Sequence, residues 1–460
     1  MPGGKFGRRD PTLRCAPALA CAIAAAAGQG LRAYVRHLTD RHLPLITAGD
    51  VPFKYQTLTF QRAALASGHV LPIYGSSELF CCGRPFRPTD VFARRPTGFD
   101  VLALGHAGTG DLLFAETFAS LGADLRNKRV VVSDSPAWFS NRDGAPPEWY
   151  GTNFVPEAAY AFIFEAPISL PTREMGARRM LAYPETLQEQ PLLRRAAEDL
   201  ADPTTIHLAR YAALAPLGRV ATWGLEVRDA ARSAAFLWRE RRRPEVSPRP
   251  APLDWLEMAA RGTGVARAAS TTNPFGFTDA TYRRMRRGPK FRDALALYDS
   301  GRSNRDGTVF ARPRRWERRF LHSREWSDLR LALRVLREVG ARPLVWTLPL
   351  PGAYYDYTPI SAPVRGRYYA RFERTAERSR VPWLDFRAHD DDPGFVSDLG
   401  SHLSARGWAF ADRAVDVFWH AGSLEDIRAA LATLAREVPA PGSPGDLAHA
   451  APSRPAMRSD

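Results

Sequence analysis

The sequence predicts a doubly wound α/β fold, in which helices flank a parallel sheet. Five short apolar runs are candidate strands, and each ends in small or turn-forming residues. Continuous apolar runs are typical of parallel strands that are buried on both faces. Segments with helical spacing lie between these runs. One of them ends at Gly340, and a strand starts after two intervening residues. The expected strands are 70–74, 101–104, 129–132, 343–347 and 381–385.

Two helices fit directly between the expected strands. Residues 111–121 follow the second strand with helical spacing, and residues 326–339 alternate leucine and valine with arginine and glutamate. Such helix-to-strand units are the repeating element of a doubly wound sheet. Two further helices, at 405–421 and 424–438, should close the domain.

A large insertion should separate the third strand from the helix at 326–339. Roughly 190 residues lie between them, too many for a simple crossover. We therefore expect one α/β domain over 41–438, with a mainly helical insertion at about 150–320. The proline-rich and serine-rich segment 439–460 predicts a disordered tail. Helices are expected in the insertion at 156–166, 185–201, 205–215 and 228–241.

Residues 1–40 predict an N-terminal signal-anchor or signal peptide. Basic residues precede an apolar, alanine-rich run that starts at Cys15, and small residues follow it at Gly28 and Gly30. Extended to Leu31, the run has 17 residues, the lower limit for crossing ~30 Å of hydrocarbon. An ordinary alanine-rich helix is the alternative. No later stretch is long and apolar enough to cross a membrane, so the chain after residue 40 is expected to be soluble.

The charge of the chain is a weak guide to its partners. A net charge of +15 would by itself favour nucleic acid, an anionic membrane or a polyanionic substrate. However, 60 of the 64 basic residues are arginine and alanine is abundant, a composition typical of GC-rich coding sequence. The basic, proline-rich segment 239–251 lacks interleaved aromatic residues and predicts a loop. We expect no nucleic-acid partner.

The four cysteines predict neither a metal site nor a disulfide framework. Cys15 and Cys21 lie in the apolar run and Cys81 and Cys82 are adjacent, so no zinc-binding or secreted disulfide spacing is present. We expect no metal and no cofactor.

The first candidate for chemistry is Gly75-Ser76-Ser77-Glu78, which directly follows the first expected strand. A serine at the carboxyl end of a parallel strand lies at the crevice where open α/β sheets bind ligands. Glycine permits a tight turn there, and backbone N–H groups of the turn can stabilise an oxyanion. Turns in which glycine and serine follow a strand are also common in proteins where they have no catalytic role.

The second candidate is the pair Asp398 and His402, just before the helix expected at 405–421. A serine hydroxyl needs an imidazole to accept its proton, and the imidazole needs a carboxylate to fix its tautomer. The acidic run 390–392 is expected to be a solvated turn, and His389 has no distinguishing partner in the sequence. Ser404 is interpreted as the N-cap of the following helix.

These blocks follow the chain order of the SGNH hydrolase superfamily and, more closely, resemble the DltD family, the D-alanine transfer proteins of teichoic-acid D-alanylation. The resemblance runs from about residue 45 to 420, with the motifs in family order. The matching blocks are L-P-I-Y-G-S-S-E-L at 71–79, S-P-A-W-F at 135–139, N-P-F-G at 273–276, W-T-L-P-L-P-G at 346–352 with Y-D-Y at 355–357, and G-S-H-L-S-A-R-G-W at 400–408.

The resemblance implies roles for individual residues. Ser77 would be the nucleophile, with Ser76 as the fallback, His402 the general base and Asp398 the residue that orients it. Gly108, chosen over Gly105, would join Ser77 in the oxyanion hole. Ser76, Glu78 and Trp138 would line the substrate pocket.

The sequence departs from the family in three places. Three residues separate Asp398 from His402, where the family usually has two. The third-block asparagine of the superfamily is absent, as in the DltD pattern, so one oxyanion donor is unassigned. The N-terminal apolar run is also short and alanine-rich.

The resemblance also implies a location, a function and partners. The chain would be held to the membrane by one N-terminal segment, with its SGNH-like α/β domain, the catalytic part, outside the cytoplasm. It predicts a cell-envelope acyltransfer protein that passes D-alanyl groups to hydroxyls of an anionic polymer, teichoic acid, through a serine acyl-enzyme. Its partners would be a membrane-bound O-acyltransferase and a D-alanyl carrier protein. The alternatives are an envelope esterase, thioesterase or acyltransferase acting on another polymer, and a non-catalytic, carrier-binding partner of the membrane enzyme.

Overall fold

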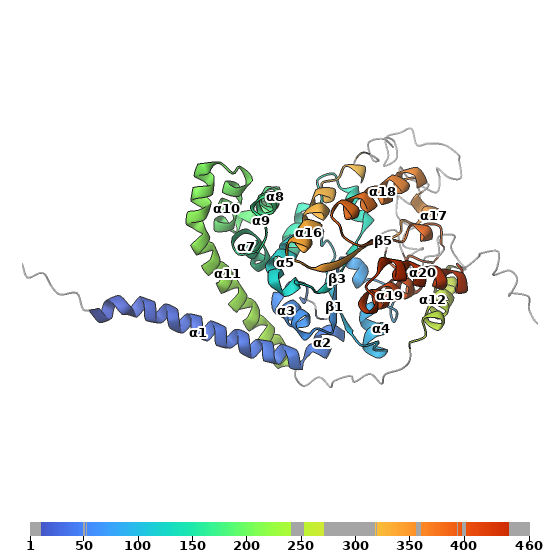
Figure 1. The fold of residues 1–460 in the computed structure, drawn as a ribbon, viewed down its shortest axis with the longest axis horizontal. Coiled ribbons are helices and arrows are strands. Elements are labelled where there is room, and N and C mark those ends of the chain that lie inside the picture. Colours follow the sequence, from blue (N-terminus) through green and yellow to red (C-terminus); the bar gives the residue numbers. More distant parts are fainter. Residues whose placement is uncertain are drawn as a thin grey trace, which may run out of the picture.

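The fold is built on one five-stranded parallel sheet with the strand order β2-β1-β3-β4-β5 (Figure 1). The computed structural model describes residues 11–48, 51, 53–240, 253–270, 318, 320–355, 360–392, 394–397 and 402–440. All five predicted strands are present, and their ends differ from the prediction by no more than two residues. They are β1 Val70–Gly75, β2 Asp100–Gly105, β3 Arg129–Asp134, β4 Arg342–Thr347 and β5 Trp383–Asp385.

The strands are buried on both faces, which explains their continuous apolar sequences. Along β1, Tyr74 belongs to one hydrophobic core, whereas Leu71 and Ile73 belong to the other. Successive side chains of a strand point to opposite faces, so a sheet covered on both sides needs apolar residues at every position. The doubly wound α/β class is therefore confirmed.

Each face of the sheet has its own layer of helices. One core is shared with α3 Leu58–Ser67, α5 Asp111–Leu121, α16 Glu325–Glu338 and α18 Ala362–Arg378. The opposite core is shared with α4 Pro88–Arg94, α12 Trp255–Ser270, α19 Ala405–His420 and α20 Leu424–Glu437. The helices predicted between and after the strands correspond to α5, α16, α19 and α20. The short elements are η1 Ser77–Leu79, η2 Gly122–Leu125, α17 Gly352–Tyr355 and η4 Arg387–His389.

The described part of the segment between β3 and α16 is helical. Two details differ from the prediction. The helix predicted at 185–201 is divided in two, because Pro191 cannot continue a helix and instead begins one. The elements are η3 Pro136–Ser140, α6 Pro147–Asn153, α7 Pro156–Phe164, α8 Leu170–Met180, α9 Pro184–Gln188, α10 Pro191–Ala201, α11 Thr205–Glu240 and α12.

The second difference is α11, one helix of 36 residues where two were predicted. It continues through Pro216, a residue that normally kinks or ends a helix. Packing against α7 stabilises this part of the helix. Gly218 lies against Phe164 so closely that a Cβ atom there would be 2.3 Å from the ring. Tertiary contacts thus outweigh the local helix-breaking signal.

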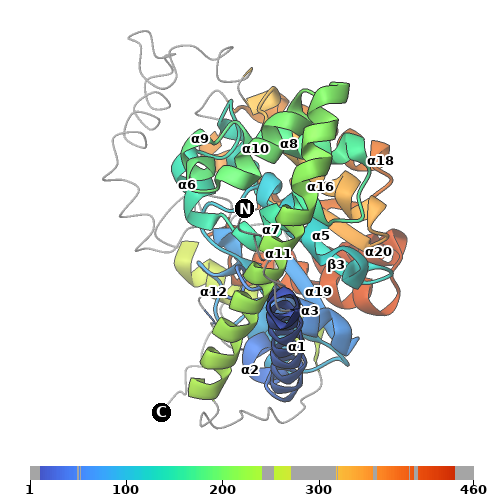
Figure 2. The ribbon, with the colours of Figure 1, turned by 90° about the vertical axis from the view of Figure 1, so that its left-hand side faces the viewer.

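The N-terminal region forms α1 Pro11–Arg41 and α2 Leu43–Ala48. The helix α1 continues through Gly28 and Gly30, where the apolar run of the sequence ends. It runs beside the C-terminal half of α11 (Figures 1 and 2), where Gly28 faces Trp223 and Arg32 pairs with Glu226 at 2.7 Å. Within the residues that the structure describes, no helix combines the length and apolarity that a membrane crossing needs. The predicted loop at 239–251, beyond Glu240, and the tail, beyond residue 440, lie outside the described residues.

Candidate active site

The candidate site begins where β1 ends. The chain passes from β1 to β2 on one side, and β3 lies on the other side of β1. Connections therefore leave the sheet in opposite directions at this point, and such a switch point opens the crevice in which doubly wound folds bind ligands. Ser76 follows β1 directly, and Ser77 is the first residue of η1.

Two glycines allow the loops after β1 and β2 to meet closely. Gly75 and Gly105 are register partners at the ends of these strands. A Cβ atom on Gly105 would lie 2.1 Å from the carbonyl oxygen of Gly75, a distance that no side chain can occupy. The close approach brings the residues after Gly105 beside Ser76.

The structure brings Ser77 and His402 together across 325 positions of the chain. Ser77 Oγ lies 2.8 Å from His402 Nε2, at hydrogen-bonding distance, and both residues are partly exposed. A hydroxyl in this position can pass its proton to a neutral imidazole, and an opening to solvent leaves room for a substrate.

The loop that carries His402 is held by its own backbone. Val396 and Leu403 form an antiparallel bridge, and the Ser397 N–H donates to the carbonyl of His402 at 2.7 Å. Ser404 accepts hydrogen bonds from two backbone N–H groups at the start of α19, so the predicted N-cap is confirmed. The imidazole is thus anchored between a closed loop and a buried helix. Asp398, the predicted acid, lies outside the described residues.

The two adjacent serines have different surroundings. The Ser76 hydroxyl donates to the carbonyl of His106 at 3.1 Å and accepts from the Gly108 N–H at 3.2 Å. Ser76 is therefore engaged by the loop after β2, whereas the Ser77 hydroxyl faces the imidazole of His402. The geometry favours Ser77 over Ser76 as the nucleophile.

The loop after β2 is held from α6 by a residue that the sequence did not single out. Asn153 Nδ2 donates to the carbonyl of Ala107 at 3.1 Å, and its Oδ1 lies 2.9 Å from His106 Nδ1. Gly108 has φ +92°, a conformation that favours glycine. Asn153 lies in the helical segment far along the chain, and no motif marks it.

Glu78 is a buried carboxyl beside the two serines. Its Oε1 accepts from the Ser76 N–H at 2.8 Å. Burial raises the pKa of Glu78, while the Ser76 N–H and a positive charge on His402 act in the opposite direction. Glu78 therefore holds the backbone of the turn through its hydrogen bond with the Ser76 N–H.

Trp138 lies in η3, after β3, on another side of the crevice. Its ring is buried and meets the ring of Trp149 edge to face, with the centroids 4.9 Å apart. Trp149 is 42% exposed and packs against the Gly108 backbone. The two indoles thus form an aromatic wall next to the loop that carries Gly108.

Cys81 and Cys82 form a disulfide between neighbours, which corrects the expectation from their spacing. Spacing rules concern loops closed between separated cysteines, whereas adjacent residues need only a local turn. Within the described residues, the two sulfurs and a ring nitrogen of His402 lie within 4.8 Å of one another and could hold a metal ion. The two sulfurs are bonded to each other here, and we assign no metal to them.

Within the acidic run 390–392 only Asp391 is exposed, so the prediction of a solvated turn was wrong for Asp390 and Asp392. Asp390 accepts from the Leu350 N–H at 2.9 Å and pairs with the buried Arg365 at 2.9 Å. Burial raises the pKa of Asp390 to about 6. Asp392 pairs with the buried Arg406 at 3.0 Å. These ion pairs fix the chain just before the His402 loop.

His389, for which the sequence offered no partner, has two in the structure. Its Nδ1 lies 3.0 Å from Asp392 Oδ2, and its ring stacks on Phe395 with a centroid distance of 3.9 Å. Neither contact could be read from the sequence, because both depend on the turn that follows η4. His389 supports the loop rather than joining Ser77.

Comparison of this chain with known proteins identifies the family to which it is similar. The family model described as "DltD protein" matches residues 51–420. Protein DltD of Bacillus subtilis is 26% identical over 387 residues, which cover 84% of this chain and 92% of that protein. Protein DltD of Staphylococcus aureus is 22% identical over 352 residues, which cover 76% of this chain and 81% of that protein.

Proposed function

The chain belongs to the DltD family, and from this premise we propose that it is a serine acyltransferase that transfers D-alanyl groups to hydroxyls of teichoic acid in the cell envelope. Family membership supports a role in teichoic-acid D-alanylation. The observation that carries the catalytic part is the 2.8 Å contact between Ser77 Oγ and His402 Nε2 at the switch point of the sheet.

In the proposed first step, Ser77 Oγ attacks the carbonyl carbon of an activated D-alanyl donor. His402 Nε2 accepts the hydroxyl proton as the new C–O bond forms. The bond to the leaving group of the donor then breaks, and His402 returns the proton to that group. In the second step a polymer hydroxyl loses its proton to His402 and attacks the ester carbonyl. The ester bond to Ser77 then breaks, and His402 returns the proton to Ser77 Oγ.

The negative charge of each tetrahedral intermediate needs hydrogen-bond donors. We assign this role to the backbone N–H groups of Ser77 and Gly108. The Gly108 N–H donates to Ser76 Oγ at 3.2 Å, and this long bond would be exchanged for the oxyanion. Asp398 would orient His402, and Ser76, Glu78 and Trp138 would border the substrate.

The location and partners of the chain belong to the same proposal. Family membership supports a cell-envelope location. We assign the N-terminal segment to the membrane as a signal-anchor, with the catalytic domain outside the cytoplasm. A membrane-bound O-acyltransferase and a D-alanyl carrier protein would supply the acyl group.

Mass spectrometry of the acyl-enzyme tests this function. The full chain is incubated with a D-alanyl thioester, and Ser77→Ala is compared with Ser76→Ala, a matched control one residue away. We expect a D-alanyl adduct on Ser77 that persists in Ser76→Ala and is absent from Ser77→Ala. The Ser76→Ala adduct should form more slowly because the 105–109 loop loses a hydrogen bond.

An adduct on Ser76, or one that survives in Ser77→Ala, would contradict the assignment of the nucleophile. Labelling by a fluorophosphonate provides a donor-independent check. If neither reagent modifies Ser77 in the folded chain, the enzymatic proposal fails and the carrier-binding alternative replaces it.

A further inference from the structure

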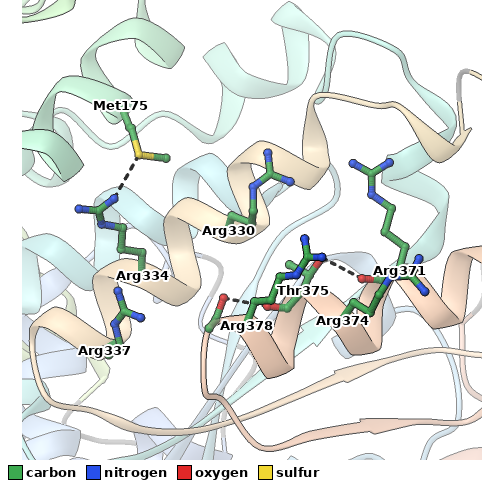
Figure 3. Close-up of a pocket in the computed structure, with 9 residues that line it drawn as sticks. Met175, Arg330, Arg334, Arg337, Arg371, Arg374, Thr375 and Arg378 are labelled. Atoms are coloured by element: carbon green, nitrogen blue, oxygen red, sulfur yellow. Dashed lines mark hydrogen bonds between the residues drawn. The ribbon is translucent and has the colours of Figure 1, made fainter.

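Six arginines line a groove between α16 and α18, on the outer side of one helix layer (Figure 3). Arg330, Arg334 and Arg337 recur at helical spacing on α16, so they share one face of that helix. The groove encloses about 440 Å³, and Met175, Thr375 and Ser379 complete its lining. On α18 the matching residues are Arg371, Arg374 and Arg378.

The positive charge of the groove is largely unneutralised. Among the described residues, only one of the six arginines has a carboxylate within 4 Å, namely Arg334, which pairs with Glu338 at 2.9 Å. Glu338 is also engaged by Thr172 and Ser169. Burial lowers the pKa of Arg371, and repulsion from Arg330 and Arg374 lowers it further. An anion in the groove would relieve this repulsion.

The number and spacing of the guanidiniums indicate a ligand with several charges. The first and last arginine on each helix are seven positions apart, a length of about 10 Å at 1.5 Å per residue. One guanidinium can donate two parallel hydrogen bonds to a phosphate, so six of them exceed what a single phosphate accepts. A short stretch of a polyanion would use both walls.

The groove is also connected to the candidate site through packed aromatic rings. The Arg371 guanidinium lies 4.8 Å from the centre of the Trp326 ring, and Trp326 packs against Phe139 at a centroid distance of 4.1 Å. Phe139 is the neighbour of Trp138, which we place at the substrate pocket. A chain of packed side chains therefore runs from the groove to the residue next to Trp138.

We propose that the groove between α16 and α18 binds a phosphodiester polyanion, holding one stretch of the acceptor polymer while another stretch reaches Ser77. This inference rests on the proposed function, since it names the site that holds the polymer. An anionic membrane would offer the same phosphate chemistry. The two facing walls favour a flexible chain, because a flat surface cannot reach both walls at once.

Binding of a short synthetic poly(glycerol phosphate) oligomer to the full chain tests the proposal. The variant Arg337→Gln/Arg374→Gln/Arg378→Gln removes three groove arginines whose guanidiniums make no hydrogen bond or ion pair with any described residue. We expect its affinity for the oligomer to fall about tenfold at low salt. The slope of log affinity against log salt should decrease in magnitude by about two.

A matched control separates the groove from net charge. Arg194→Gln/Arg219→Gln/Arg436→Gln removes the same charge from exposed positions on α10, α11 and α20. This control should bind the oligomer within about twofold of the parent chain, because the oligomer is held by the local charge of the groove rather than by the net charge of the chain. An equal loss of affinity in both variants would overturn the proposal.

Two further binding experiments, with inorganic phosphate and with anionic vesicles, identify the class of ligand. Inorganic phosphate should compete weakly, and competition equal to that of the oligomer would replace the polyanion with a single-ion site. Vesicles of anionic phospholipid should bind both triple variants equally. If the groove variant instead loses vesicle binding and keeps oligomer binding, the groove is a membrane-contact surface and the proposal fails.

The test is independent of the catalytic proposal. Ser77→Ala should bind the oligomer like the parent chain, and the groove variant should keep its fluorophosphonate labelling. A chain that binds the oligomer through the groove but is not labelled at Ser77 would contradict only the proposed function. A labelled chain that does not bind the oligomer would contradict only the groove.

Discussion

The candidate active site and the arginine groove are built in opposite ways. At the site, partners come from four distant segments and meet through single hydrogen bonds, such as the 2.8 Å contact of Ser77 with His402. In the groove, three arginines recur at helical spacing on α16 and three on α18, and their positive charges repel one another. The site depends on the position of individual atoms, whereas the groove depends on summed charge.

This difference determines how each region should respond to substitution. Removing one group from a hydrogen-bonded catalytic set removes the reaction path, so the loss is large and insensitive to salt. Removing one of six like charges removes a fraction of the attraction, and salt screens the remainder. Four substitutions can test this contrast.

The largest effect is expected from His402→Ala. Without the imidazole, no group accepts the Ser77 proton, and general-base catalysis typically contributes 10²- to 10⁴-fold. We expect acylation of Ser77 to slow by about 10³-fold, while binding of the phosphate oligomer is unchanged. Stopped-flow or quenched acylation assays measure the first quantity. A parallel loss of oligomer binding would show that the two regions are not separable.

A substitution of Glu116 tests the buried layer between the two regions. Glu116 lies on α5, which packs against α16, one wall of the groove. Burial raises the pKa of Glu116 to about 8 in the folded state, whereas an unfolded chain has a value near 4.5. The native state therefore holds the proton more tightly, and its stability falls as the pH rises between these values.

The variant Glu116→Gln removes this pH dependence and keeps an acceptor for the Tyr150 hydroxyl, which donates to Glu116 at 2.7 Å. Between pH 5 and pH 8 the variant should gain on the order of 3 kcal/mol of unfolding free energy relative to the parent chain. Urea unfolding at both pH values measures this gain. The exposed Glu148→Gln is the control, and an equal gain there would refute the assignment to Glu116.

Asn153→Ala should have a smaller effect, confined to the site. Loss of its hydrogen bonds to His106 and Ala107 releases the loop that carries Gly108. We expect the acylation rate to fall about 10- to 30-fold with little change in donor binding, since a displaced oxyanion donor acts mainly in the transition state. A change in donor binding alone would assign Asn153 to the substrate pocket instead.

The smallest effect should come from Arg378→Gln. One guanidinium of six contributes on the order of 0.5 kcal/mol at an exposed position, so oligomer affinity should fall only about twofold. The salt slope should decrease by about one. Isothermal titration at two salt concentrations measures both. A loss of tenfold or more would make Arg378 a single dominant contact and contradict the summed-charge picture.

Much of the secondary structure follows from local sequence. The helix predicted at 111–121 is α5 with the same ends, and the strand predicted at 70–74 is β1 with one further residue. Buried parallel strands and amphipathic helices carry strong periodic signals that tertiary packing does not change. The long helix α11 escaped prediction because packing against α7 outweighs Pro216.

The identities of Ser77 and His402 as candidates also came from the sequence, because each lies in a short block with a chemical reason for its residue types. Only the tertiary structure decided which partners these blocks have. Asn153, the pairing of His389 with Asp392 and the facing arginines of α16 and α18 arise from contacts between separate segments. A sequence records the period and chemistry of each segment, whereas hydrogen bonds and charge clusters depend on distances that only packing creates.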